Sequence, residues 1–115
     1  MTSREVEISG ITLAVTNMQD MVKFYSKVFG LNFTATDIGD ARLYSADWQG
    51  RRLLFCPAEI AKNTAKQNRH QFEFYVQDLD AIKKKIETSG GTIFDSTGNA
   101  ISVYDPDMNS MVFTR

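Results

Sequence analysis

The clearest hydrophobic pattern in the chain predicts an amphipathic helix at about residues 17–29. Its apolar positions, spaced by three and four residues, are Met18, Met21, Val22, Tyr25, Val28 and Phe29. This period is typical of a helix that buries one face. Asn17 is a favourable N-cap, because its side-chain oxygen can accept a hydrogen bond from a free amide of the first turn. Gly30 follows the last apolar position and can adopt the left-handed conformation that ends a helix.

Strand-like alternation precedes this helix and returns later in the chain. Residues 8–16 alternate Ile11, Leu13 and Val15 with smaller residues, which predicts a strand with two different faces. Residues 71–76 alternate in the same way. A second helix is then predicted at about 78–89, with Asp78 as its N-cap and Gly90-Gly91 at its end. Its apolar stripe consists of Leu79, Ile82 and Ile86.

The two halves align at one constant offset of 61 residues (76 minus 15). The offset matches residues of similar type in similar structural roles: Val15 with Val76, Asn17 with Asp78, Met18 with Leu79, Gly30 with Gly91, and Phe33 with Phe94. Agreement of this kind indicates an internal duplication.

Three short strand-like runs, separated by turn residues, follow each predicted helix. They cover residues 31–37, 41–48, 51–56, 92–95, 100–104 and 110–114. Each half therefore has the order βαβββ, and the fold class is α+β with two mixed sheets. We expect one domain over residues 1–115, with modules at about 8–57 and 70–114 and a polar surface linker at 58–69. A helix covers only one face of its sheet, so we expect the remaining faces to form a cleft between the modules.

Composition narrows the classes of function. The chain of 115 residues carries 13 basic and 14 acidic residues, and this balance disfavours nucleic acid as a partner. No apolar run approaches the roughly 18 residues that cross a bilayer, so we expect no membrane partner. The N-terminal residues lack the apolar core of a signal peptide, and the single cysteine, Cys56, has no intrachain disulfide partner. These features together predict a cytoplasmic protein.

Four segments carry a resemblance to a known superfamily. They are residues 11–17 (ITLAVTN), 24–31 (FYSKVFGL), 74–80 (FYVQDLD) and 105–109 (DPDMN). With these motifs the chain resembles the vicinal oxygen chelate superfamily over about residues 8–114. That superfamily includes glyoxalase I, extradiol dioxygenases, fosfomycin-resistance enzymes and bleomycin-binding proteins. The resemblance implies the glyoxalase/bleomycin-resistance fold, and it also implies that the protein is a homodimer.

The resemblance also implies where a divalent ion would bind in metal-dependent relatives. The four matching positions here are Gly10, Gln71, Val112 and one residue of the Leu53-Leu54 pair. Only Gln71 has a side chain that can coordinate, and an amide alone holds a hard divalent ion poorly. We therefore expect no metal and no cofactor. The single histidine, His70, is next to Gln71 and should point to the opposite face of its strand.

Six residues are predicted to contact a ligand in the cleft. Gln71, Glu73 and Tyr75 share one strand face by alternation, while Thr12 and Ser110 face them from other strands and Trp48 offers an aromatic wall. Together these residues form either the polar floor of a binding site or a set of satisfied polar groups inside an ordinary half-barrel. Two further aromatic residues, Tyr44 and Phe55, lie with Trp48 and Tyr75 on strands that could line the same cleft.

Three functional hypotheses remain open from the sequence. The first is a metal-free protein that binds a small organic molecule, as the drug-sequestering relatives do. The second is a metal-dependent lyase or dioxygenase with ligands at unexpected positions, such as His70, Gln71 and Glu73. The third is a non-catalytic structural or partner-binding module. The chain has no glycine-rich phosphate loop and no nucleophile elbow, so enzymatic activity has no support from a motif.

Overall fold

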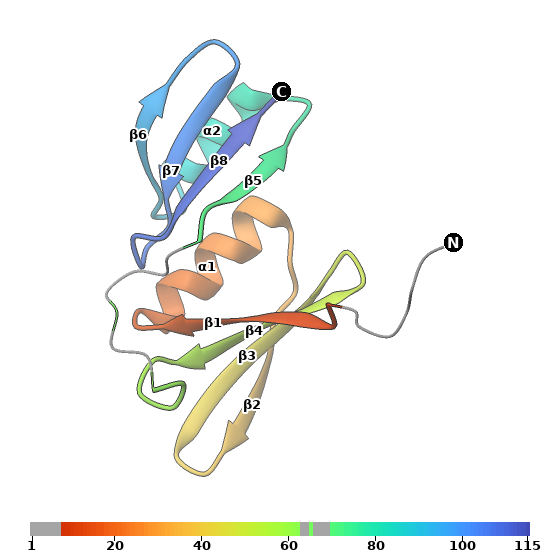
Figure 1. The fold of residues 1–115 in the computed structure, drawn as a ribbon, viewed down its shortest axis with the longest axis vertical. Coiled ribbons are helices and arrows are strands. Elements are labelled where there is room, and N and C mark those ends of the chain that lie inside the picture. Colours follow the sequence, from red (N-terminus) through yellow and green to blue (C-terminus); the bar gives the residue numbers. More distant parts are fainter. Residues whose placement is uncertain (1–7, 63–64, 66–69) are drawn as a thin grey trace.

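The structure is a computed structural model that describes residues 8–62, 65 and 70–115. The first module contains β1 (Gly10–Val15), α1 (Met18–Phe29), β2 (Thr34–Ile38), β3 (Ala41–Trp48) and β4 (Arg51–Pro57). The second contains β5 (Phe72–Tyr75), α2 (Leu79–Glu87), β6 (Thr92–Ser96), β7 (Ala100–Tyr104) and β8 (Ser110–Thr114). Figure 1 shows the two modules one above the other. Residues 63–64 and 66–69 of the predicted linker and the N-terminal residues 1–7 lie outside the described residues.

Each module builds its own mixed sheet of four strands. The strand orders are β1-β4-β3-β2 and β5-β8-β7-β6. The pairs β1–β4 and β5–β8 are parallel, and the other pairs are antiparallel. The α+β fold of two βαβββ modules is therefore confirmed, including its internal duplication.

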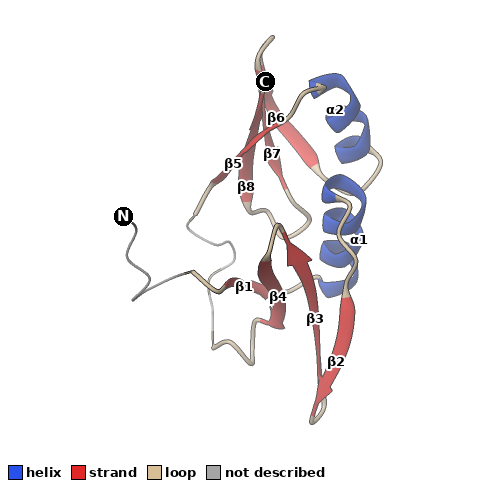
Figure 2. Ribbon diagram, turned by 90° about the vertical axis from the view of Figure 1, so that its right-hand side faces the viewer, coloured by secondary structure: helices blue, strands red, loops and turns tan. Residues whose placement is uncertain are grey.

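Both helices lie on the same side of the two sheets, at the right of Figure 2. The opposite sides of the sheets carry the alternate residues of each strand, and we call this surface the open face. In the first sheet it includes Thr12, whose neighbours in register are Leu54 and Ser45. In the second sheet it includes Glu73, which pairs with Val112. The open faces are thus turned in a common direction.

Helix α1 packs against strands of both modules and joins them in a single core. The ring of Tyr25 lies 5.2 Å from that of Phe55 in β4. The ring of Phe29 lies 5.9 Å from that of Phe113 in β8 and 4.8 Å from that of Phe74 in β5. Gly91 allows this close approach, because a Cβ placed there would lie only 2.5 Å from the Phe24 ring. The modules are therefore not independent units joined only by a linker.

The residues predicted to end or cap the helices are confirmed at Gly30, Asp78 and Gly90, and the prediction is wrong at Asn17. Gly30 is left-handed, with φ 69°, and the Asp78 side chain accepts from the Ala81 amide at 3.0 Å. Helix α2 ends at Glu87 with Thr88 as its C-cap, and the left-handed residue beyond it is Gly90. The predicted capping role of the Asn17 side chain is wrong, since that side chain accepts no hydrogen bond from α1.

Candidate functional site

The aspartates of the 105–109 turn hold the modules together. Asp105 is buried, and its carboxylate accepts four hydrogen bonds. The Asp107 and Asn109 amides donate to Oδ1, both at 2.9 Å, and Asn109 Nδ2 donates to Oδ2 at 3.1 Å. The fourth donor is the hydroxyl of Tyr25 in α1, at 2.8 Å from Oδ2. Asp105 thus fixes the turn internally and ties it to the helix of the other module.

Asp107 binds the residues just before the start of α1. Its Oδ1 accepts from the Asn17 amide at 2.9 Å and from Asn17 Nδ2 at 2.8 Å, while its Oδ2 accepts from the Thr16 amide at 2.9 Å. A carboxylate at this place also interacts favourably with the positive end of the α1 dipole. The 105–109 motif, one of those that carried the sequence resemblance, therefore has a structural function here.

Burial governs the ionisation of this turn. It raises the pKa of Asp105 above its ordinary value, although the hydrogen bonds from Asn109, Tyr25 and Asp107 act in the opposite direction. It also raises the pKa of Tyr25 well above its ordinary value, and the nearby Asp105 carboxylate adds to that effect. Tyr25 therefore keeps its proton at neutral pH and serves as a hydrogen-bond donor.

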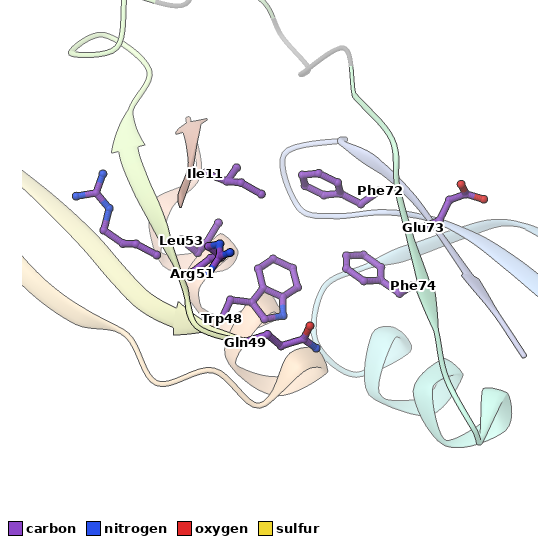
Figure 3. A pocket seen from close by; sticks show the side chains of 9 residues that line it. Ile11, Trp48, Gln49, Arg51, Leu53, Phe72, Glu73 and Phe74 are labelled. Atoms are coloured by element: carbon purple, nitrogen blue, oxygen red, sulfur yellow. The ribbon is translucent and has the colours of Figure 1, made fainter. Parts of the chain in front are cut away.

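A cavity of about 300 Å³ lies between the modules, and we call it the inter-module groove (Figure 3). Its lining residues come from β1, from the β3–β4 hairpin and from β5: Ile11, Trp48, Gln49, Arg51, Arg52, Leu53, Phe72, Glu73 and Phe74. In Figure 3, Ile11 and Leu53 face Phe72 and Phe74 across the groove, with Trp48 between them. Apolar walls with a few polar groups at the margin are typical of small-molecule sites.

The aromatic rings of the groove continue into the core. Trp48 stacks on Phe74, with ring centroids 5.6 Å apart and an interplanar angle of 22°, and its ring lies 4.9 Å from that of Phe29. Trp48, Phe72 and Phe74 are only partly buried, so each presents ring surface to the groove. The core thus supports a preformed aromatic wall.

His70 extends this aromatic side of β5. Its ring lies 4.3 Å from that of Phe72, on the opposite face from Gln71, as alternation predicts. Burial lowers the pKa of His70 below its ordinary value, with a smaller opposing effect from Asp105. The imidazole is therefore predominantly uncharged at neutral pH.

The polar groups around the groove do not all face it. Arg51 pairs with Trp48 across the hairpin and shares the strand face of the buried Leu53. Gln49 begins the hairpin turn with a φ of 52°, which is uncommon for a residue other than glycine, and its side chain lies beside Trp48 (Figure 3). The Glu73 carboxylate points away from the groove in the same view.

The structure distributes the six predicted ligand residues over two places. Trp48 lies in the groove, and Glu73 borders it while directing its carboxylate to the open face. Gln71 also lies on the open face, where its Nε2 donates to Ser110 Oγ at 3.2 Å. Tyr75 is 74% exposed there, and Thr12 is exposed on the first sheet.

Of the other aromatic candidates, Phe55 is fully buried and Tyr44 is half-buried beside Gln19, which donates to its hydroxyl at 3.1 Å.

The sequence predicted a cleft between the modules, but its predicted ligand residues included neither Phe72, Phe74 nor Arg51, which line the groove. The sequence did contain a sign that Arg51 shares a strand face with Leu53, because the two residues are two positions apart and Arg51 lies at the hairpin end of the strand. What the sequence lacked was the position of β5 opposite that hairpin.

The residues at the family's metal positions do not fit a divalent ion. A Cβ at Gly10 would lie 2.6 Å from the backbone oxygen of Arg52, so a larger ligand residue would require the backbone to shift. Leu53 is buried in the core, which leaves the apolar Leu54 on the open face, and Val112 is equally unable to coordinate. Within residues 8–62, 65 and 70–115, no three His, Cys, Asp or Glu side chains are grouped closely enough to hold a metal ion.

No helix among the described residues is long and apolar enough to cross a membrane.

This architecture defines a protein of the glyoxalase and bleomycin-resistance type. The family model described as a glyoxalase-like domain matches residues 10–113, and the chain belongs to that family. A search of curated protein sequences found no match.

Solved structures with low sequence identity share the fold. A fosfomycin resistance protein from Listeria monocytogenes is 15% identical with a TM-score of 0.75, covering 96% of this chain and 91% of its own. A glyoxalase/bleomycin resistance protein/dioxygenase family enzyme from Burkholderia phytofirmans is 16% identical with a TM-score of 0.71, covering 94% and 97%. An antibiotic binding protein from Streptomyces sp. CB03234 is 14% identical with a TM-score of 0.67, covering 98% of each chain.

Proposed function

We propose that this protein is a metal-free member of its family that binds a small organic molecule in the inter-module groove. The observation that carries the proposal is the cavity of about 300 Å³ whose walls include Trp48, Phe72 and Phe74. Stacking on such rings contributes roughly 0.5–1.5 kcal/mol beyond the burial of apolar area. The names of two similar structures, an antibiotic binding protein and a fosfomycin resistance protein, support a small molecule as the partner.

Titration with a flat neutral probe tests this function. We expect 2-naphthamide to bind the purified chain saturably, with one site per chain by calorimetry, and to raise its Tm because the probe binds only the native state. Absence of saturable binding by 2-naphthamide and by other flat bicyclic compounds would contradict the proposal. The alternative of a structural or partner-binding module would then be favoured.

For metal content, we expect gently purified protein to contain no stoichiometric divalent ion by elemental analysis. The reason is chemical, since Gly10, Leu54 and Val112 offer no donor atom in their side chains beside the Gln71 amide. One zinc, nickel or iron per chain, lost on the substitution Gln71→Ala, would support the metal-dependent lyase or dioxygenase alternative.

For assembly, we propose a homodimer. Large apolar side chains are exposed at Ile38 (63%), Tyr75 (74%) and Phe94 (46%), and every residue of β2, at the edge of its sheet, is exposed. Exposed edges and apolar surface of this kind favour pairing with another copy. Sedimentation at micromolar concentration should give twice the mass of the chain, and a monomer under these conditions would contradict the proposal.

A further inference from the structure

Arg51 gives the apolar groove one positive charge. Its side chain leaves β4 on the same face as Leu53, and its cross-strand partner is Trp48 (Figure 3). Its hydrogen bond is a long one, from Nη1 to the backbone oxygen of the adjacent Gly50 at 3.4 Å. Among the described residues, Arg42 forms an ion pair with Asp37. No carboxylate of the described residues lies within 4.0 Å of the Arg51 guanidinium. The guanidinium is thus placed beside the groove without an acidic partner in the described part of the chain.

The side chains of Glu73 and Gln49, which also line the groove, do not neutralise the positive charge of Arg51. Glu73 directs its carboxylate to the other side of β5, so it does not neutralise Arg51. Gln49 lies next to Trp48 at the same margin and has an amide group that can donate a hydrogen bond. The groove therefore combines an apolar aromatic wall with donors at one end.

We propose that the ligand of the inter-module groove is a flat aromatic molecule with a single carboxylate. This inference rests on the proposed function and adds the chemical class of the ligand. The ring would lie along Trp48 and Phe72, and the carboxylate would accept from the Arg51 guanidinium. A guanidinium matches a carboxylate in a bidentate geometry, and such charge-assisted hydrogen bonds are roughly twice as strong as neutral ones.

The next residue along the strand provides a matched control. Arg52 has the same side chain, is also exposed and also borders the groove, but alternation turns its side chain to the open face. Its Cβ lies beside Gly10, and its cross-strand partner is Asp47. Replacing either arginine by glutamine removes one positive charge, at adjacent positions of the same strand. A difference in binding between the two variants therefore depends on where each side chain points and not on the net charge of the protein.

The test compares 2-naphthoate with 2-naphthamide, which has nearly the same shape and no charge. By calorimetry with the whole chain in low salt, we expect naphthoate to bind about tenfold more tightly than the amide, the equivalent of about 1.4 kcal/mol. Arg51→Gln should remove that preference and leave amide binding within about twofold, whereas Arg52→Gln should leave the preference in place. The preference should also weaken as salt is raised.

Two results would overturn the inference while leaving the proposed function standing. One is equal affinity of the wild-type protein for the two probes. The other is a preference for naphthoate that Arg51→Gln retains, whatever the effect of Arg52→Gln. Failure of both probes to bind contradicts the proposed function itself. Arg51→Lys provides a further check, since it should retain part of the preference for the anion.

Discussion

Replacement of Asp105 by alanine is expected to lower the free energy of unfolding by at least about 3 kcal/mol. The substitution leaves four donors without their acceptor: two backbone amides, the Asn109 amide group and the Tyr25 hydroxyl. Each buried donor left unsatisfied costs about 1–3 kcal/mol, and even partial rearrangement leaves more than one of them. A domain is stable by only about 5–15 kcal/mol, so the loss is large. Urea unfolding followed by the fluorescence of Trp48 measures it.

The matched control is Asp40→Ala in the exposed turn between β2 and β3. An exposed aspartate without a buried partner should change the stability by less than about 0.5 kcal/mol. The loss of stability caused by Tyr25→Phe should lie between those of Asp40→Ala and Asp105→Ala, because this substitution removes one of the four donors to Asp105. Equal stabilities of the Asp105→Ala and Asp40→Ala variants would show that the turn does not hold the modules together.

Replacement of Trp48 by alanine is expected to weaken the binding of 2-naphthamide by at least about tenfold. The change removes the largest ring of the groove, and burial of an aromatic side chain or ligand ring contributes about 25 cal/mol for each Å² of apolar surface. Calorimetry measures the affinity, and circular dichroism checks that the variant is folded. Because Trp48 also contacts Phe29, Phe72→Ala provides a second groove variant with less contact to the core.

Two open-face variants are the controls for this prediction. Tyr75→Ala removes an exposed ring, and Glu73→Gln removes a charge while it keeps the volume. Both should leave the affinity within about twofold, because neither side chain projects into the groove. If Tyr75→Ala abolished binding while Trp48→Ala did not, the ligand would occupy the open face with Gln71, Glu73 and Tyr75. That result would refute the groove as the binding site.

The local structure followed from the sequence because its causes are local. The three- and four-residue spacing of apolar positions defined α1, and the glycine after it ended the helix as expected. Asp78 capped α2 because a side-chain acceptor and its amide donor lie three residues apart. The duplication was visible for a similar reason, since both modules use the same order of caps, stripes and turns.

Contacts between the modules did not follow from the sequence. Asn17 is of a residue type that favours the N-cap position, but its side-chain amide and its backbone amide both donate to Asp107, 90 residues away. The groove depends in the same way on the placement of Phe72 and Phe74 opposite Trp48. Alternation correctly separated the two faces of β5, yet it could not tell which face adjoins a cavity.

Ligand binding in the inter-module groove can be observed through the single tryptophan of the chain. Its indole gives one Nε1–H signal in a proton–nitrogen correlation spectrum, and that signal reports from inside the inter-module groove. We expect 2-naphthamide to shift this signal progressively to saturation, together with the backbone amide signals of Phe72 and Phe74. The amide signals of Thr12 and Thr114 should stay in place. An indole signal that does not move at a probe concentration that saturates the calorimetric titration would refute binding in the groove.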